Sequence, residues 1–291
     1  MGLTVHVGQR TDRLADSLAE LLAAPSADPF AEDVVVVPAK GVERWLTQRL
    51  SHRLGAQPGR ADGVCAGVRF LNPVSLVVLL TGTEASDAWD PDRLVWSVLR
   101  VVDSCLDEPW CRTLARHLGQ HLAGDERDMR RDRRWSVARR VAGLFASYAA
   151  QRPQLLDDWM SGADLDGAGS VLDGDLRWQA ELWRRVAADV GEPVPPDRHR
   201  NAVAAIVGGA PLPLPDRLSL FGHTRLTSAD LDLVRAVAAV REVHLWLPTA
   251  SPLAWQHLDA AVSGGPVRRR LDTSATLVAH PLLATLGRDS R

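Results

Sequence analysis

The chain begins with a strand–loop–helix pattern, the arrangement that binds phosphate in many α/β proteins. Alternating apolar residues at 3–7 are followed by the loop Gly8-Gln9-Arg10-Thr11 and by a helical spacing of leucines over 14–22. A hydrolysing phosphate loop needs several glycines, a lysine for the β- and γ-phosphates and a serine or threonine for Mg²⁺. This loop has one glycine and no lysine. We therefore expect Gly8 to make a tight turn in an empty phosphate loop.

The single lysine of the chain, Lys40, lies in a second loop, Pro38-Ala39-Lys40-Gly41. No glycine precedes Lys40 in this loop, and no serine or threonine follows it directly. An NTP-dependent, helicase-like enzyme that uses Lys40 as its phosphate lysine stays open as an alternative function. Lys40 also forms a small basic–aromatic cluster with Arg44 and Trp45, and such a cluster is typical of nucleic-acid contacts.

A larger basic cluster lies at the expected start of a helix. Residues 127–140 contain seven arginines and one tryptophan. Arginine is suited to phosphate, and an aromatic ring can stack on a base. The alternative is a solvated helix face, on which these arginines pair with Asp128 and Asp132. The residues predicted to contact DNA here are Arg130, Arg131, Arg133, Arg134 and Trp135.

Other residue types that carry chemistry are sparse. His117 and His121 are four residues apart on an expected helix, but no third metal ligand is evident, so solvated histidines are expected. The cysteines Cys65, Cys105 and Cys111 form no CxxC pair, and we expect reduced thiols. We expect no catalytic residue, no bound cofactor and no metal in this chain.

The composition is ordinary for a soluble globular protein. The chain has 291 residues, of which 46% are hydrophobic and 24% charged, and its formal net charge is −2. Because the chain has no overall basic character, any nucleic-acid site must be a local patch. The longest apolar stretches are too short to span a membrane, and the first residues lack the pattern of a signal peptide. We expect a cytoplasmic protein.

The apolar periodicity predicts an α/β fold, with a parallel sheet flanked by helices and an all-helical insertion. The valine run 33–37 is typical of a strand that is buried on both faces of a parallel sheet. From 91 to about 190 every periodic segment is helical, and a strand–helix–strand pattern returns after the proline-rich linker 191–215. The predicted parts are a first α/β segment over 1–85, a helical insertion over 86–200 and a return to the α/β domain over 201–291.

Several blocks of the sequence, in order, resemble one family. They are VVVVPAKGVERWLTQRLSHRLG, GVCAGVRFLNP, SYAAQRPQLLDDW, WQAELWRRV, RLSLFGHTRLTSADLDLVRAV, VHLWLPTASPLAW and HPLLATLG. Together they resemble the N-terminal region of RecC, the gamma subunit of exodeoxyribonuclease V, the RecBCD helicase–nuclease complex. The resemblance covers essentially the whole chain.

The resemblance implies the fold of an inactive superfamily 1 helicase. Residues 3–22 would be the degenerate counterpart of the phosphate-loop unit in a 1A-like, P-loop NTPase-like domain. The helical insertion would be the 1B-like subdomain. ATP and Mg would then be bound by the partner subunits and not by this chain.

The resemblance also implies a role in DNA repair and recombination. RecC proteins bridge the RecB-like helicase–nuclease and RecD-like helicase subunits, channel single strands from DNA ends, and read the Chi sequence. Better-known members have amide and hydroxyl side chains in the second loop, whereas this chain offers Lys40 and Arg44, which suit phosphate. We therefore expect this loop to contact the strand. The positions that the resemblance assigns to Chi reading are Pro38, Lys40, Arg44, Asn72 and Val78.

Family members are several times longer than 291 residues. We therefore expect the chain to be a fragment or the product of a truncated reading frame.

Overall fold

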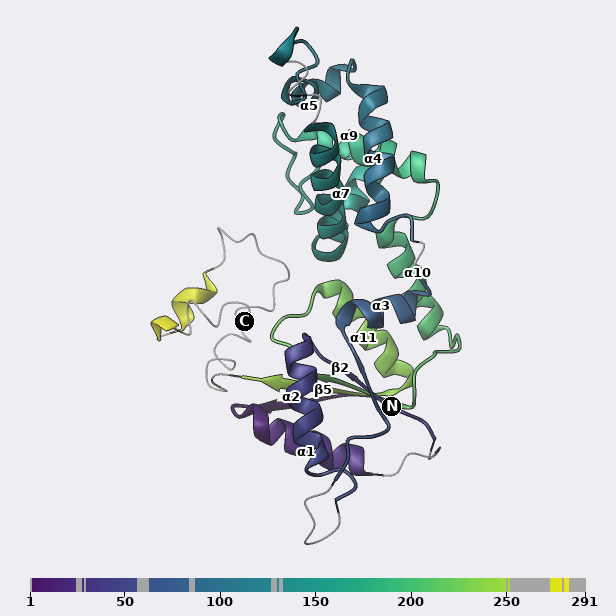
Figure 1. Ribbon diagram of the computed structural model, residues 1–291, viewed down its shortest axis with the longest axis vertical. Coiled ribbons are helices and arrows are strands. Elements are labelled where there is room, and N and C mark those ends of the chain that lie inside the picture. The colour runs from purple at the N-terminus through teal and green to yellow at the C-terminus, as the bar shows by residue number, and fades with distance from the viewer. Residues whose placement is uncertain are drawn as a thin grey trace. The chain divides into compact units, whose positions relative to one another are not determined.

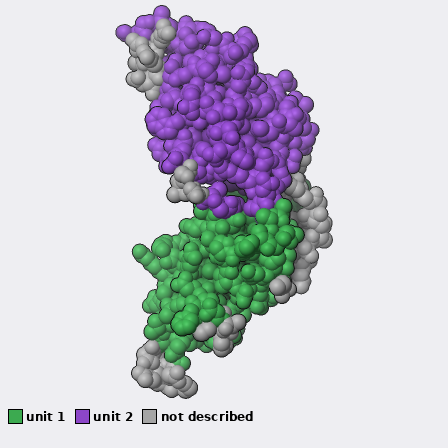
Figure 2. All heavy atoms as spheres, turned by 90° about the vertical axis from the view of Figure 1, so that its right-hand side faces the viewer, with its two compact units in different colours: residues 1–80, 203–291 green, residues 81–202 purple. Residues whose placement is uncertain are grey.

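The computed structural model describes residues 2–24, 28, 30–56, 63–83, 87–126, 130, 133–249, 251, 273–278 and 280–282. The chain divides into two compact units, which Figure 2 colours separately. The first, here called the α/β unit, comprises residues 1–80 and 203–291, and the second, here called the helical unit, comprises residues 81–202. One continuous segment therefore interrupts the α/β unit in sequence.

The α/β unit is built on a parallel sheet. Its strands in the described part of the chain are β1 (Gly2–Gly8), β2 (Asp33–Val36), β3 (Val68–Leu71), β4 (Arg217–Phe221) and β5 (Glu242–Pro248). The strand order is β1-β5-β4-β2-β3, and every neighbouring pair is parallel. The two strands that follow the helical unit thus lie between strands that precede it. The prediction of a parallel α/β sheet is confirmed.

Helices flank this sheet on both faces (Figure 1). They are α1 (Thr11–Ala23), α2 (Lys40–Ser51), α3 (Pro73–Thr81) and α11 (Ser228–Val240), and α10 (Pro195–Val207) crosses the boundary between the units. The leucines of α1 and α2 share one core with Val35 and Trp246. Val36 points to the opposite face, because side chains alternate along a strand, and it lies near Leu76 of α3 and Leu233 of α11.

Side-chain burial differs between the inner strand β2 and the edge strand β1. The valines at 34–37 are at most 4% exposed, as expected for a strand covered on both faces. Leu3, Val5 and Val7 of β1 are 40%, 49% and 54% exposed. Their neighbours in β5 on the same face, Val243 and Leu245, are buried. The row on β1 is exposed because β1 is an edge strand of the described sheet.

The helical unit packs its helices around one apolar core. They are α4 (Pro91–Cys105), the 3₁₀ turn η1 (Pro109–Cys111), α5 (Arg112–His117), α7 (Arg133–Gln151), α8 (Pro153–Met160) and α9 (Arg177–Val190). Phe145, Trp159 and Trp183 form the centre of this core and are each 1% exposed. The predicted run of helices over this segment is confirmed. No helix in the described ranges is both long and apolar enough to cross a membrane.

The sequence prediction for the two histidines was wrong about the helix. α5 ends at His117, and Gly119 has a left-handed backbone with φ of 73°. His121 therefore lies beyond the helix instead of one turn along the same face. Both imidazoles are exposed, and no group of three or more potential metal-binding side chains exists among the residues described.

The three cysteines are free thiols, and Cys105 and Cys111 are buried. Burial raises the pKa of Cys111 to about 11 and also raises the pKa of Cys65. Both thiols are therefore protonated at neutral pH and weakly reactive.

Candidate nucleic-acid interface

The loops that follow parallel strands gather at one edge of a sheet, where ligands of open α/β folds usually bind. In the α/β unit these are residues 9–10 after β1, 37–39 after β2, Asn72 after β3 and 222–227 after β4. We call this set of loops the loop edge. It contains the loop between β1 and α1 and the loop that leads to Lys40.

At the loop edge, Gly8 lies close to the side chain of Leu14. A Cβ atom added at Gly8 would lie 3.1 Å from side-chain carbons of Leu14 in α1, closer than an ordinary contact. Only Gln9 and Arg10 lie between the end of β1 at Gly8 and the start of α1 at Thr11, so Gly8 stands at a tight strand-to-helix turn, as expected. Its φ is not positive, so the glycine serves the close approach to Leu14 and not a left-handed backbone.

The first turn of α1 is occupied by an ion pair between Arg10 and Asp12. Hydrogen bonds from Arg10 lower the pKa of Asp12 to about 2, so this carboxylate is charged at neutral pH. A helix N-terminus favours negative charge, and here the protein's own carboxylate supplies it. The carboxylate would repel a phosphate at the same place.

The second loop leads into α2, whose first turns carry the predicted basic–aromatic cluster. Lys40 Nζ donates to both carboxylate oxygens of Glu43, at 2.7 and 2.9 Å. Arg44 is exposed and has no ion pair to a residue that the structure describes. Trp45 is 39% exposed, and its ring centroid lies 6.3 Å from that of Phe221. All three members of the cluster are thus exposed, and Arg44 is the cation without an ion pair to a described residue.

Two further predicted contacts lie on α3, after the neighbouring strand. Asn72 Oδ1 accepts a hydrogen bond of 2.8 Å from the Ser75 amide, which caps the helix. Val78 is 41% exposed and Val74, one turn earlier, is 71% exposed, so α3 presents an apolar stripe. Pro38 is exposed in the loop before α2. Because β2 pairs with β3, the starts of α2 and α3 lie at the same part of the loop edge.

The loop after β4 adds a cation that the sequence prediction missed. Gly222 has φ of 75°, and a Cβ atom added there would lie 3.7 Å from Val42 in the first turn of α2. Arg225, three residues later, is exposed and has no ion pair in the described ranges. Only the pairing of β4 with β2 brings this loop to α2, and that pairing spans the helical unit.

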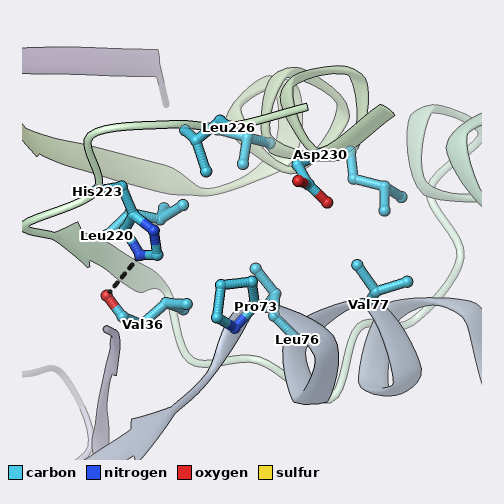
Figure 3. A pocket seen from close by; sticks show the side chains of 10 residues that line it. Val36, Pro73, Leu76, Val77, Leu220, His223, Leu226 and Asp230 are labelled. Carbon is cyan, nitrogen blue, oxygen red and sulfur yellow. Dashed lines mark hydrogen bonds between the residues drawn. The ribbon is translucent and has the colours of Figure 1, made fainter. Parts of the chain in front are cut away.

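Beneath the loop edge lies a small cavity between α3 and α11 (Figure 3). Its volume is about 10 Å³, room for one water at most and far too small for a base. His223 lines it, is 3% exposed, and its Nε2 lies 3.2 Å from the Val36 carbonyl oxygen. Burial lowers the pKa of His223, so the ring is neutral at neutral pH. This cavity supports the loops and is not itself a ligand site.

In the helical unit, the predicted arginines differ in their contacts. Arg130 donates to Glu126 at 2.8 Å, and Arg134 donates to Asp103 at 2.9 Å. Arg133 is exposed and has no ion pair within the described residues. Arg131, Asp128 and Asp132 lie outside the described residues. The predicted pairs with these two aspartates therefore stay predictions.

The remaining predicted residue, Trp135, contacts a tryptophan that the sequence prediction did not single out. Its ring centroid lies 4.8 Å from that of Trp96 in α4. Both rings are largely exposed. A helical wheel could have identified Trp96, because it lies about 200° around α4 from both Leu94 and Val98, which are buried.

Comparison with known proteins identifies the family. The family model for the RecC N-terminal domain matches residues 3–291. The chain belongs to the RecC family. It is 54% identical over 294 residues to the RecBCD enzyme subunit RecC of Mycobacterium tuberculosis (strain H37Rv), which covers 100% of this chain and 26% of that protein. It is 52% identical over 291 residues to the corresponding subunit of Mycolicibacterium smegmatis, 100% of this chain and 25% of that protein.

A more distant RecC shows how far the likeness extends. The RecBCD enzyme subunit RecC of Escherichia coli is 23% identical over 267 residues, 87% of this chain and 22% of that protein. The chain thus spans about a quarter of the length of the curated RecC relatives it matches. The family resemblance read from the sequence blocks is confirmed.

Proposed function

We propose that this RecC chain is a non-catalytic, DNA-binding scaffold part of an exodeoxyribonuclease V (RecBCD) complex. In that role it would guide single-stranded DNA during resection of double-strand breaks for homologous recombination, in the cytoplasm, beside RecB-like and RecD-like subunits. One observation carries the proposal: 54% identity along the entire chain with a protein named as the RecC subunit of the RecBCD enzyme.

The order of elements supports a helicase-like domain organisation. A parallel sheet that is interrupted in sequence by a helical unit matches the expected 1A-like domain with a 1B-like insertion. In this interpretation the α/β unit is the 1A-like domain, and β1, its loop and α1 are the remnant of the phosphate-loop unit.

The first turn of α1 supports the non-catalytic role. The Arg10–Asp12 ion pair lies at the first turn of α1, the end of a helix at which a phosphate loop binds its phosphate. We propose that this chain binds no nucleotide cofactor and that ATP and Mg act in the partner subunits. The alternative, an NTP-dependent enzyme that uses Lys40, is disfavoured because no glycine precedes Lys40 in its loop and no serine or threonine follows it directly.

The loop edge supports strand contact through phosphate rather than base reading. Arg44 and Arg225 are exposed cations at this edge, and Trp45 offers a ring face beside Arg44. The Asn72 side-chain oxygen accepts the bond that caps α3, while its two amide N–H groups have no hydrogen-bond partner among the described residues and can donate to a base or a phosphate. Pro38, Lys40 and Val78 complete the proposed contact region.

The proposal is tested first by assembly. The chain is co-expressed with the RecB-like and RecD-like proteins of the same genome, and size-exclusion chromatography asks whether they elute together. The eluted fraction is then assayed for resection of a duplex end. Co-elution with activity supports the proposal, and separate elution of a folded chain contradicts its scaffold part.

DNA binding is tested separately on the 291-residue chain. Affinity for a single-stranded oligonucleotide is expected to fall steeply with salt, because phosphate contacts release counterions. Arg44→Ala should weaken binding, whereas Arg235→Ala, which removes another exposed arginine of the α/β unit, should not. Salt-independent affinity would contradict the proposal. ATP hydrolysis abolished by Lys40→Ala would establish the enzymatic alternative.

A further inference from the structure

The helical unit exposes two touching tryptophans on neighbouring helices. Trp96 of α4 is 58% exposed and Trp135 of α7 is 43% exposed. Their ring centroids are 4.8 Å apart, with an interplanar angle of 54°. Single exposed apolar residues are common on protein surfaces, but two adjacent indoles form a contiguous apolar patch. The other tryptophans of the described chain include four that are at most 5% exposed: Trp89, Trp159, Trp183 and Trp246.

The fold itself does not require this pair. Trp96 lies on the side of α4 away from Leu94 and Val98, which form its buried face. Neither ring belongs to the apolar core of the helical unit. At the centre of that core, Phe145 packs edge-on against Trp183. The exposed pair is therefore available to an external partner.

The charge around the pair points to an anionic partner. Arg93 lies one turn before Trp96, and Arg139 lies one turn after Trp135, each on the same helix face as its tryptophan. Both arginines, like Arg133, are exposed and form no ion pair with the residues that the structure describes.

Two of the described carboxylates near the pair are already neutralised. Arg100 donates to Asp189 through two bonds of 2.9 Å, and Arg134 pairs with Asp103 at 2.9 Å. Asp92, one turn before Trp96, is exposed at the start of α4 and is the remaining carboxylate on that helix face. Among the described residues around the two rings, free cations thus outnumber free anions.

We propose that Trp96 and Trp135 form a stacking platform for unpaired nucleic-acid bases, with Arg93, Arg133 and Arg139 contacting the phosphates on either side. The platform rests on the proposed DNA-binding function and specifies the form of DNA bound. Aromatic rings stack on any base, because every base has a π-face, and arginine supplies the complementary charge.

The geometry of the rings restricts how a strand can bind. Ring centroids 4.8 Å apart leave no space for a base between them, so a base stacks on an outer ring face. A base inside a duplex has both faces covered by its neighbours, so the platform selects single strands over duplex.

The test compares three probes on the 291-residue chain. They are a single-stranded oligonucleotide, the duplex of the same sequence, and a single strand of equal length whose sites are all abasic. Trp96→Ala and Trp135→Ala should each weaken binding of the first probe by about fivefold to a hundredfold, the range for one lost base stack. Binding of the abasic strand, which offers phosphates without bases, should not change.

Controls separate stacking from folding. Trp96→Phe keeps an aromatic face and should retain most of the affinity. Met160→Ala removes a side chain of the helical unit that is also 43% exposed and should change nothing. Thermal unfolding of every variant is expected to match the wild type, because neither tryptophan belongs to the core.

The outcomes distinguish the platform from the proposed function. A wild-type chain that binds none of the probes overturns both. Wild-type affinity in both tryptophan variants, with weakened binding by Arg44→Ala, overturns the platform alone. Loss of co-elution with RecB-like or RecD-like subunits in the tryptophan variants, with DNA binding intact, also overturns it and assigns the pair to a protein interface.

Discussion

Arg217 and Asp33 are the first residues of the neighbouring strands β4 and β2, and their side chains form an ion pair across 184 residues of sequence. The Arg217 guanidinium donates from Nε and Nη2 to the two carboxylate oxygens of Asp33, each at 2.9 Å, and from Nη1 to the Leu21 carbonyl oxygen at 2.7 Å. The side chains are only 14% and 18% exposed. This bidentate pair fixes the start of β4 beside β2, across the whole helical insertion.

Removal of Arg217 is expected to destabilise the α/β unit. Arg217→Ala leaves the Asp33 carboxylate and the Leu21 carbonyl without their donor, at a cost of about 2 kcal/mol in the free energy of unfolding. Arg217→Lys keeps the charge but not the two-pronged geometry and should cost about half as much. Urea denaturation measures both.

Arg235→Ala is the matched control for these variants. Its ion pair with Asp232 spans 3.7 Å between side chains that are 70% and 55% exposed, so its loss should cost less than about 0.5 kcal/mol. Equal stabilities of the Arg217 and Arg235 variants would show that the pair with Asp33 does not hold the strands.

The limits of sequence prediction are clearest in the two apolar strands. The run at 34–37 and the alternating residues of β1 both predict strands, and both strands form. Their burial differs because it depends on strand order, which sets β1 at the edge and β2 inside. Strand order follows from pairings across 184 residues that no local pattern encodes.

The candidate site divides in the same way. The absence of a lysine from the first loop was evident in the sequence, whereas the Arg10–Asp12 pair in that place was not. The basic–aromatic cluster of Lys40, Arg44 and Trp45 was evident from residue types alone. Arg225 and Trp96 were not, because each joins its cluster only through a tertiary contact, β4 with β2 and α4 with α7.

A pair of histidines in the sheet should make stability depend on pH. His6 Nε2 lies 3.0 Å from His244 Nδ1, and His244 Nε2 lies 3.0 Å from Glu242 Oε1. If His244 Nε2 donates to Glu242, its Nδ1 accepts from His6 Nε2. Burial, and then the neighbouring His244, lower the pKa of His6 below 6.5.

A lowered histidine pKa means that the unfolded chain takes up its proton first as pH falls. Stability conferred by neutral His6 is therefore full above about pH 6.5 and is lost as pH falls toward its pKa in the folded protein. His223 has a pKa shifted in the same direction and adds to the loss. His6→Gln should lose less stability between pH 7.5 and pH 5 than the wild type, as measured by urea denaturation at both values. Identical losses would assign the effect to His223.

The apolar row on β1 should cause self-association of the isolated chain. Leu3, Val5 and Val7 lie on an edge strand whose outer backbone groups are not paired with any described strand. Exposed apolar edges pair with other chains unless a charge interrupts them. Val5→Lys is expected to shift sedimentation toward the monomer. Val207→Lys, at another exposed valine, is the control and should have no such effect.

Variants of the two arginines at the start of α7 should separate effects on DNA binding from effects on stability. Arg133 has no described partner, so Arg133→Glu should lower affinity for single-stranded DNA and reduce the slope of affinity against salt by about 0.7, with unchanged stability. Arg134 pairs with Asp103, and Arg134→Glu would bring two carboxylates together there. We expect that variant to lose about 1 kcal/mol of stability. Equal stability and equal DNA affinity in both variants would favour a solvated helix face over a phosphate-binding surface.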